Sequence, residues 1–187
     1  KHGNDSWAYD QRGIDFIMRD QYGYNYAIQD QIYRGKSRTS HQRLMIKAAA
    51  NDNVSFETGG AYIRDAYVQS LSQVGGLKMD ERSYEPAILY VNGQYWGLYE
   101  IREKVGDSDF TSYYYDQDEK YGGGPNDVQF LRTWGGTWEE MGAPNAQNDW
   151  NTLVNFITGN DMSIQANFDY VDSVFNWKSL VDYFCLN

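Results

Sequence analysis

EPAILYVNGQYWGLYEIREKV, residues 85–105, contains the strongest structural signal in the chain. Two β-prone apolar runs, residues 87–91 and 95–101, flank Asn92-Gly93. Both central residues of a type I′ turn need a positive φ, and Asn-Gly tolerates it, so the segment predicts a two-residue β-hairpin. The predicted register pairs Val91 with Gln94, Tyr90 with Tyr95 and Leu89 with Trp96.

Both faces of the predicted hairpin are apolar. One carries Ala87, Leu89, Val91, Trp96, Leu98 and Glu100, and the other carries Ile88, Tyr90, Tyr95, Gly97, Tyr99, Ile101 and Glu103. We therefore expect the hairpin in the middle of a sheet and covered on both sides. Because its second strand ends in charged residues (100 and 102–104), a site is expected at that end.

The composition excludes several classes of protein. A chain of 187 residues with 41% hydrophobic and 17% aromatic residues is too apolar for disorder, and it has no apolar run long enough to span a membrane. Its formal net charge of −10 argues against nucleic-acid binding, which needs a basic face. No signal peptide is visible and the first residue is Lys1, so we expect a processed product. The single cysteine, Cys185, is predicted to be a core residue.

The remaining segments predict an α+β fold, because strands come first and helices follow. Strands are expected at 13–20, 22–28, 43–50 and 128–134, a flexible turn at 119–126 and a loop at 135–146. Helices are expected at 61–74, ended by Gly75-Gly76, and at 107–118, 147–159, 163–175 and 176–186. The helix at 61–74 should bury Ile63, Ala66, Tyr67, Leu71 and Val74, and the last helix Trp177, Leu180, Val181 and Phe184.

Basic residues supply the candidate binding groups. Arg34, Lys36 and Arg38 form a basic turn that is either a solvated loop or an anion contact, and its spacing is not that of a Walker A motif. Lys47 lies within a predicted strand, so it must be at a sheet edge, point outward or meet a carboxylate. Arg64 near the positive end of a helix suggests an anionic partner, or else it is a surface arginine.

Four segments together resemble the spore coat protein H (CotH) kinase family. They are Arg34–Arg38, the basic strand Arg43–Lys47, the helix start Ile63–Tyr67 and, most strongly, Ala87–Val105 with its Tyr-Val-Asn-Gly-x-Tyr-Trp-Gly-x-Tyr pattern. Their order and spacing are similar to those of the family. The tail, Ser179–Asn187, resembles the helix that precedes the family's catalytic segment.

This resemblance implies an atypical protein-kinase-like fold that transfers the γ-phosphate of ATP, with Mg²⁺, to secreted or spore-surface proteins. By position, Lys47 is implied to contact the phosphates, Arg64 to support it and Glu103 to lie at the nucleotide cleft, with Arg34 and Lys36 as further nucleotide contacts. The implied partner is a surface or coat protein, and the implied location is extracellular or the cell surface.

The aspartate-bearing metal segment of the family has no counterpart in these residues. We therefore expect no catalytic or metal-binding residue within the chain, and a single domain or lobe at 1–187, strand-rich to residue 135, helical from 136 and truncated at 187. Such a lobe is expected to be inactive alone. The alternatives are a non-catalytic surface module that binds glycan or protein through its aromatic residues, and a purely structural coat or adhesion protein.

Overall fold

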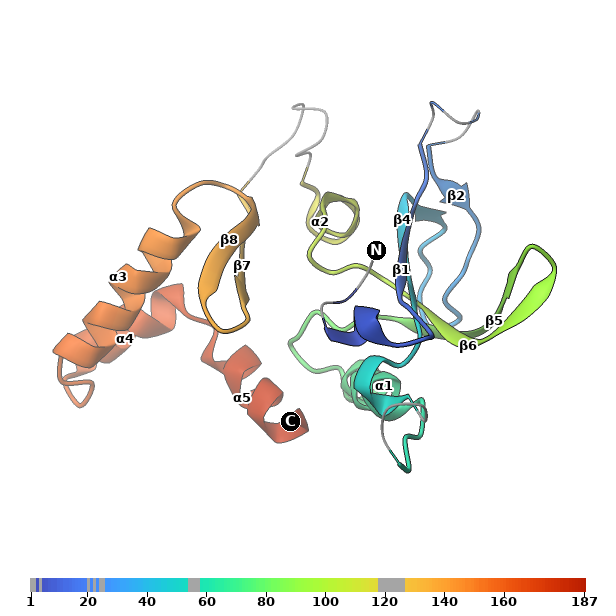
Figure 1. Ribbon diagram of the computed structural model, residues 1–187. Coiled ribbons are helices and arrows are strands. Elements are labelled where there is room, and N and C mark those ends of the chain that lie inside the picture. Colours follow the sequence, from blue (N-terminus) through green and yellow to red (C-terminus); the bar gives the residue numbers. More distant parts are fainter. Residues whose placement is uncertain are drawn as a thin grey trace. The chain divides into compact units, whose positions relative to one another are not determined.

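The computed structural model describes residues 3, 5–19, 21, 23, 26–53, 58–117 and 127–187. It divides the chain into two compact units, Lys1–Val105 and Gly106–Asn187 (Figure 1). The mixture of antiparallel sheets and helices confirms the predicted α+β class. The predicted turn at 119–126 lies outside the described residues, as do residues 22, 24 and 25 of the predicted strand at 22–28. Of its four described residues only Ile28 belongs to a strand. The single-lobe expectation stays a prediction.

The first unit is built on a four-stranded antiparallel sheet in the order β1-β4-β6-β5. Its elements are η1 (Asp5–Ala8), β1 (Ile14–Ile17), β2 (Ile28–Gln29), β3 (Ser40–His41), β4 (Arg43–Lys47), η3 (Ala50–Asp52), α1 (Arg64–Gly75), β5 (Tyr84–Val91) and β6 (Gln94–Arg102). Strands β2 and β3 pair separately. The predicted strands at 13–20 and 43–50 and the predicted hairpin are therefore present.

The hairpin has the predicted turn but a different register. Asn92 and Gly93 have φ values of 51° and 78°, as a type I′ turn requires, and Tyr90 pairs with Tyr95. Leu89 lies opposite Gly97 rather than Trp96, so the prediction for that pair was wrong. The cause is a β-bulge that adds one residue to β6, next to Gly97 at φ 143°, a conformation that L side chains rarely adopt.

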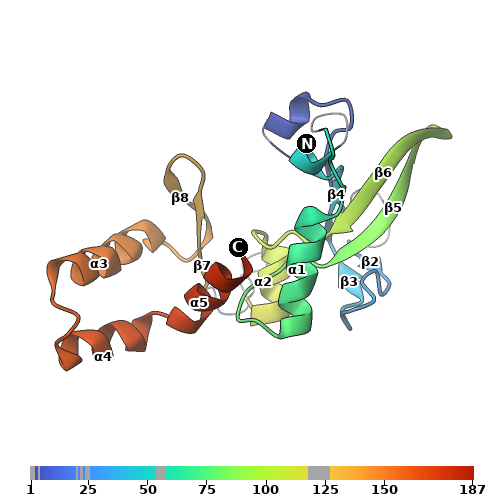
Figure 2. The same ribbon diagram turned by 90° about the horizontal axis from the view of Figure 1, so that it is seen from below.

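The prediction that the hairpin is central and covered on both sides was wrong for its turn end. Strand β5 is an edge strand, and β4 pairs only with residues 100–102 of β6. Beyond them the hairpin extends away from the rest of its unit (Figures 1 and 2), and large apolar side chains from both of its faces are exposed: Ile88, Tyr90, Val91, Tyr95, Trp96 and Leu98. Only its base, including Tyr99, is buried.

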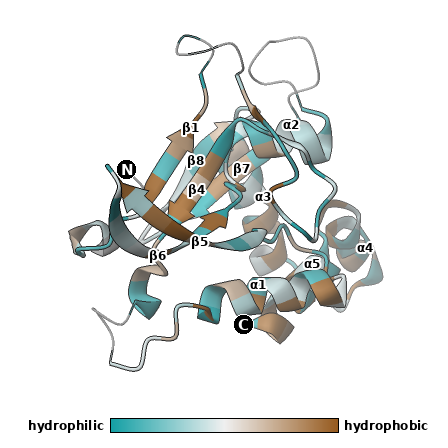
Figure 3. Ribbon diagram, turned by 90° about the vertical axis from the view of Figure 1, so that its right-hand side faces the viewer, coloured by the Kyte–Doolittle hydropathy of each residue, from teal (hydrophilic) through white to brown (hydrophobic). Residues whose placement is uncertain are grey.

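Helix α1 confirms the predicted helix but not the side that it buries. Gly76 ends it with a left-handed φ of 61°, as predicted. Ala66 and Ser72 are buried, whereas Ile63, Tyr67, Leu71 and Val74 are exposed. Polar residues of α1 instead contact the sheet and the segment before β5, and Figure 3 shows teal and brown residues mixed along the helix. Polar contacts such as Asp65 with Lys47, rather than the apolar periodicity, therefore determine which side of α1 faces the sheet.

The second unit contains a hairpin and four helices. They are α2 (Ser108–Tyr115), β7 (Gln129–Thr133), β8 (Thr137–Gly142), α3 (Ala146–Gly159), α4 (Gln165–Val174) and α5 (Trp177–Leu186). All four helices were predicted. The loop expected at 135–146 was wrong, because β8 pairs with β7 across Gly135-Gly136. Helices α3 and α4 lie side by side (Figures 1 and 2), with the rings of Phe156 and Tyr170 4.4 Å apart.

The last helix does not form the predicted core. Trp177, Leu180, Val181 and Phe184 are all exposed, as is Cys185, so the expectation of a buried apolar side with a core cysteine was wrong. Spacing at three to four residues identifies an amphipathic helix, but it does not specify what covers the helix.

Candidate functional site

Lys47 is the predicted residue with the most informative surroundings. It ends β4, an interior strand, so an edge position does not explain it. Its Nζ lies 2.5 Å from Oδ2 of Asp65, in the first turn of α1. The carboxylate partner expected for a lysine in a strand is therefore present. The Lys47 side chain keeps 13% of its surface exposed.

The Lys47–Asp65 pair is part of a larger charged cluster. Arg102, the last residue of β6, places Nη1 3.0 Å from the same Asp65 Oδ2 and 2.9 Å from Oε2 of Glu100. Glu100 is opposite Lys47 in the sheet register. We call Lys47, Asp65, Glu100 and Arg102 the strand–helix cluster. Two acids and two bases from β4, β6 and α1 thus meet on one face of the sheet.

The two acids of the cluster respond to their surroundings in opposite directions. Burial raises the pKa of Glu100, and this effect exceeds the stabilisation by Arg102. Burial also acts to raise the pKa of Asp65, but the positive charges of Lys47 and Arg102 outweigh it and hold that pKa well below its usual range. Asp65 is therefore the firmly ionised member and the anchor for both cations.

The other predicted residues form separate ion pairs. Arg34 pairs with Glu85, Lys36 with Glu81, Arg64 with Asp52 and Glu103 with Arg38. The Arg64 and Ala61 backbone N–H groups also donate to Asp52, so this aspartate ties down the start of α1. None of these four ion pairs joins two of the five predicted residues.

Glu103 differs from the other predicted residues in its burial. Its side chain is 1% exposed, and its carboxylate accepts from Nη1 of Arg38 at 3.2 Å. Nearby, the buried His41 ring lies edge-on to the Tyr33 ring at 5.4 Å and approaches the Arg38 carbonyl. Glu103 therefore belongs to a buried structural network.

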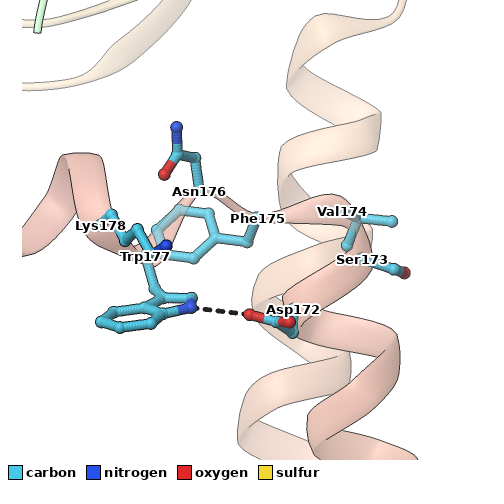
Figure 4. Close-up of a pocket in the computed structure, with 7 residues that line it drawn as sticks. All are labelled: Asp172, Ser173, Val174, Phe175, Asn176, Trp177 and Lys178. Carbon is cyan, nitrogen blue, oxygen red and sulfur yellow. Dashed lines mark hydrogen bonds between the residues drawn. The ribbon is translucent and has the colours of Figure 1, made fainter. Parts of the chain in front are cut away.

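A separate hollow lies where α4 meets α5. It has a volume of about 400 Å³ and is lined by seven consecutive residues, 172–178. Figure 4 shows the Trp177 indole donating to the Asp172 carboxylate at 2.7 Å, with Phe175 beside them. This hollow contains none of the residues predicted to bind a nucleotide.

Comparison with protein families gives one match. The family model described as CotH kinase protein matches residues 2–187. The chain belongs to the CotH kinase protein family. The resemblance detected in the sequence is thereby confirmed, and membership indicates a kinase-like role. In comparisons with curated proteins and with solved structures, no significant match was found.

In this CotH family chain, sequence reasoning missed three of the four members of the strand–helix cluster as site residues. Glu100 and Arg102 were noted only as charges at a strand end, and Asp65 only as part of the segment Ile63–Tyr67. A usable signal existed: Lys47 required a carboxylate, and Asp65 begins the next helix along the chain. Asp65, the neighbour of Arg64, is the residue that contacts Lys47, and a supporting role for Arg64 stays a prediction.

Neither a membrane-spanning helix nor a group of metal-binding side chains is found among the described residues. Over the described part of the chain, no helix has both the length and the apolar character that crossing a membrane requires. Within the same residues, no group of three or more His, Cys, Asp or Glu side chains is arranged to hold a metal ion.

Proposed function

We propose that this chain contributes the nucleotide-binding part of an ATP-dependent protein kinase whose acceptors are secreted or surface proteins outside the cell. The Lys47–Asp65 ion pair carries the proposal. Protein kinases hold their phosphate-contacting strand lysine with an acid from a neighbouring helix, and both must be in place for activity. A strand lysine, a helix acid and family membership coincide here.

Lys47 is assigned the role of contacting nucleotide phosphates. ATP would supply the γ-phosphoryl group, whose negative oxygens need positive charge nearby. The Lys47 ammonium can provide it from a side chain that is 13% exposed, and Asp65 fixes the direction of that ammonium from α1. Because the described residues offer no acidic cluster fitted to Mg²⁺, no step is assigned to a metal ion held by them.

The other nucleotide contacts implied by the resemblance stay predictions. Arg34 is mostly exposed and free to reorient, although Glu85 holds it in this structure, and Lys36 and Arg64 are likewise paired with carboxylates. Glu103 has the least support, because a buried carboxylate that already accepts from Arg38 is not open to a ligand.

Calorimetric titration with Mg·ATP tests the proposal. Lys47→Met should weaken binding about 10- to 100-fold, the range for losing a charge-assisted hydrogen bond. Lys104→Met is the matched control, because Lys104 has similar exposure and also pairs with an aspartate, Asp15. Equal affinity of wild type and Lys47→Met, or no binding by either, would contradict the proposal.

The exposed end of the hairpin favours a second candidate, a surface module that binds glycan or protein. Tyr90, Tyr95 and Trp96 are exposed there, and aromatic side chains with one polar atom suit such contacts. A glycan array and a pull-down with surface proteins, each repeated with Trp96→Ala, test it. Binding that Trp96→Ala abolishes, in a protein without affinity for Mg·ATP, would favour this candidate over the kinase.

A further inference from the structure

Arg102 is fully buried, with no exposed side-chain surface, unlike the cations Lys47 and Arg34 of the same unit. It lies opposite Met45, on the same face of the sheet as Lys47 and Glu100. Taking an arginine out of water is costly unless its charge is paired and its N–H groups find acceptors. The contacts of Arg102 therefore explain why this position is charged.

Those contacts centre on Asp65. Nη1 of Arg102 reaches Asp65 at 3.0 Å and Glu100 at 2.9 Å, and Nη2 lies 3.5 Å from the Arg82 carbonyl. The other Asp65 oxygen, Oδ1, accepts from Gln69 one turn further along α1. The carboxylate is thus held from β4, from β6 and from its own helix.

Sharing one oxygen has an electrostatic consequence. Lys47 and Arg102 both approach Asp65 Oδ2, so neither cation has that carboxylate to itself. The second acid, Glu100, accepts from Arg102, and no hydrogen bond joins it to Lys47 in the structure, while its burial disfavours the ionised form. The Lys47 ammonium, the more exposed of the two cations, therefore keeps positive potential toward an arriving anion.

We propose that Arg102 is a positioning residue that fixes Asp65 and thereby holds Lys47 in the geometry for binding nucleotide phosphate. The inference rests on the proposed function for its ligand, but its geometric part stands without one. Arg102 does not touch the phosphate, and it acts through Asp65. Its guanidinium fork is suited to this, because one nitrogen bridges two acids and a second reaches a carbonyl.

The test has one readout that needs no ligand. Carbon-13 NMR follows the Asp65 carboxyl group from pH 7 to pH 3 in wild type, Arg102→Met, Arg102→Lys and Arg43→Met. Arg43→Met is the matched control, because Asp15 Oδ2 is likewise shared by an arginine, Arg43, and a lysine, Lys104. Asp65 should stay ionised in wild type and in the control, and it should begin to protonate within this range in Arg102→Met. In Arg102→Lys it should protonate to a smaller extent than in Arg102→Met.

The second readout is a double-mutant cycle on Mg·ATP affinity. Arg102→Met should weaken binding about tenfold, a coupling typical of residues in one network, and should add little once Lys47→Met is present. Full additivity of the two substitutions would overturn the inference, because a merely structural Arg102 would act independently of Lys47.

The outcomes separate the two proposals. If wild type does not bind Mg·ATP but Asp65 protonates earlier in Arg102→Met, the kinase proposal fails and the positioning of Asp65 by Arg102 stands. An unchanged Asp65 titration in folded Arg102→Met overturns the positioning role whatever the nucleotide does. If Arg102→Met does not fold, Arg102→Lys decides, and a titration and affinity equal to those of wild type overturn the role.

Discussion

Helices α1 and α5 have similar apolar spacing, yet they differ in what they contribute to their own units. Helix α1 places Asp65, Gln69 and Ser72 among polar partners and leaves its apolar residues exposed. Helix α5 buries no residue at all, and Phe184 on its apolar side is 70% exposed. The difference shows that fixed charges on the sheet, rather than apolar area, determine how α1 packs.

The same contrast extends to the two units. The buried residues of the first unit include Arg38, Glu100, Arg102 and Glu103, all paired. In the second unit, the helices α3 to α5 bury only Ala146. Since buried ion pairs are weak contributors to stability but costly to break, the first unit should be sensitive to loss of a charge. Helices α3 to α5 of the second unit should be insensitive to loss of apolar side chains.

The largest expected effect is on the buried Arg38–Glu103 pair. Arg38→Leu removes one charge and leaves Glu103 buried without its partner, which should lower the free energy of unfolding by about 3–5 kcal/mol. Arg34→Leu is the control, because Arg34 pairs with Glu85 while 83% of its side chain is exposed, and it should change stability little. Urea unfolding monitored by tryptophan fluorescence measures both. Equal effects would mean that burial does not distinguish the two pairs.

A second pair of substitutions compares apolar residues across the two units. Met45→Ala empties a fully buried position in β4 and should cost about 2–5 kcal/mol. Phe184→Ala on α5 should change stability by no more than about 0.5 kcal/mol, as is usual for an exposed position. The same urea experiment measures the two. A large cost for Phe184→Ala would show that α5 is covered in solution and would remove the contrast.

These contrasts define what could be predicted from the sequence. Local chemistry identified many elements: Asn92-Gly93 specified the turn, Gly76 the end of α1, and the sequence pattern the helices α1 to α5, although not the short 3-10 helices η1 and η3. The bulge beside Gly97 was not predicted, because the Asn-Gly turn specifies the pairing next to it but not an extra residue further along β6. The placement of β5 at an edge was not predictable either, because it depends on which strands meet across long separations in the chain. The register error at Leu89 follows directly from that bulge.

The candidate site shows the same division between local and long-range information. That Lys47 lies at a sheet edge, points outward or meets a carboxylate was readable from its position in a strand, since a buried unpaired ammonium is costly. Which carboxylate Lys47 meets was not readable. Asp65 comes from a helix 18 residues further along the chain, and Arg102, which holds Asp65, comes from a strand 55 residues beyond Lys47. Their contact exists only once α1 lies on the sheet.

The smallest expected effect, and the sharpest in sign, concerns the acids of the strand–helix cluster. The folded pKa of Asp65 is below its unfolded value of about 3.9, so Asp65 contributes stability above that pH and loses it as the pH falls. The folded pKa of Glu100 is above its unfolded value of about 4.3, so its contribution is present at low pH and lost as the pH rises. As the pH falls from 7 to 3, wild type should therefore lose stability relative to Asp65→Asn and gain stability relative to Glu100→Gln.

Unfolding by urea at four pH values across that range measures both differences. Their size should be modest, because the Asp65 side chain is more than one-third exposed and solvent screens its interactions. If these two differences in the free energy of unfolding change with pH in opposite directions, Arg102 holds one acid ionised while burial disfavours the charge of the other. Slopes of the same sign would contradict the assignment of Asp65 as the ionised anchor of Lys47, and the polar packing of α1 would then need another cause.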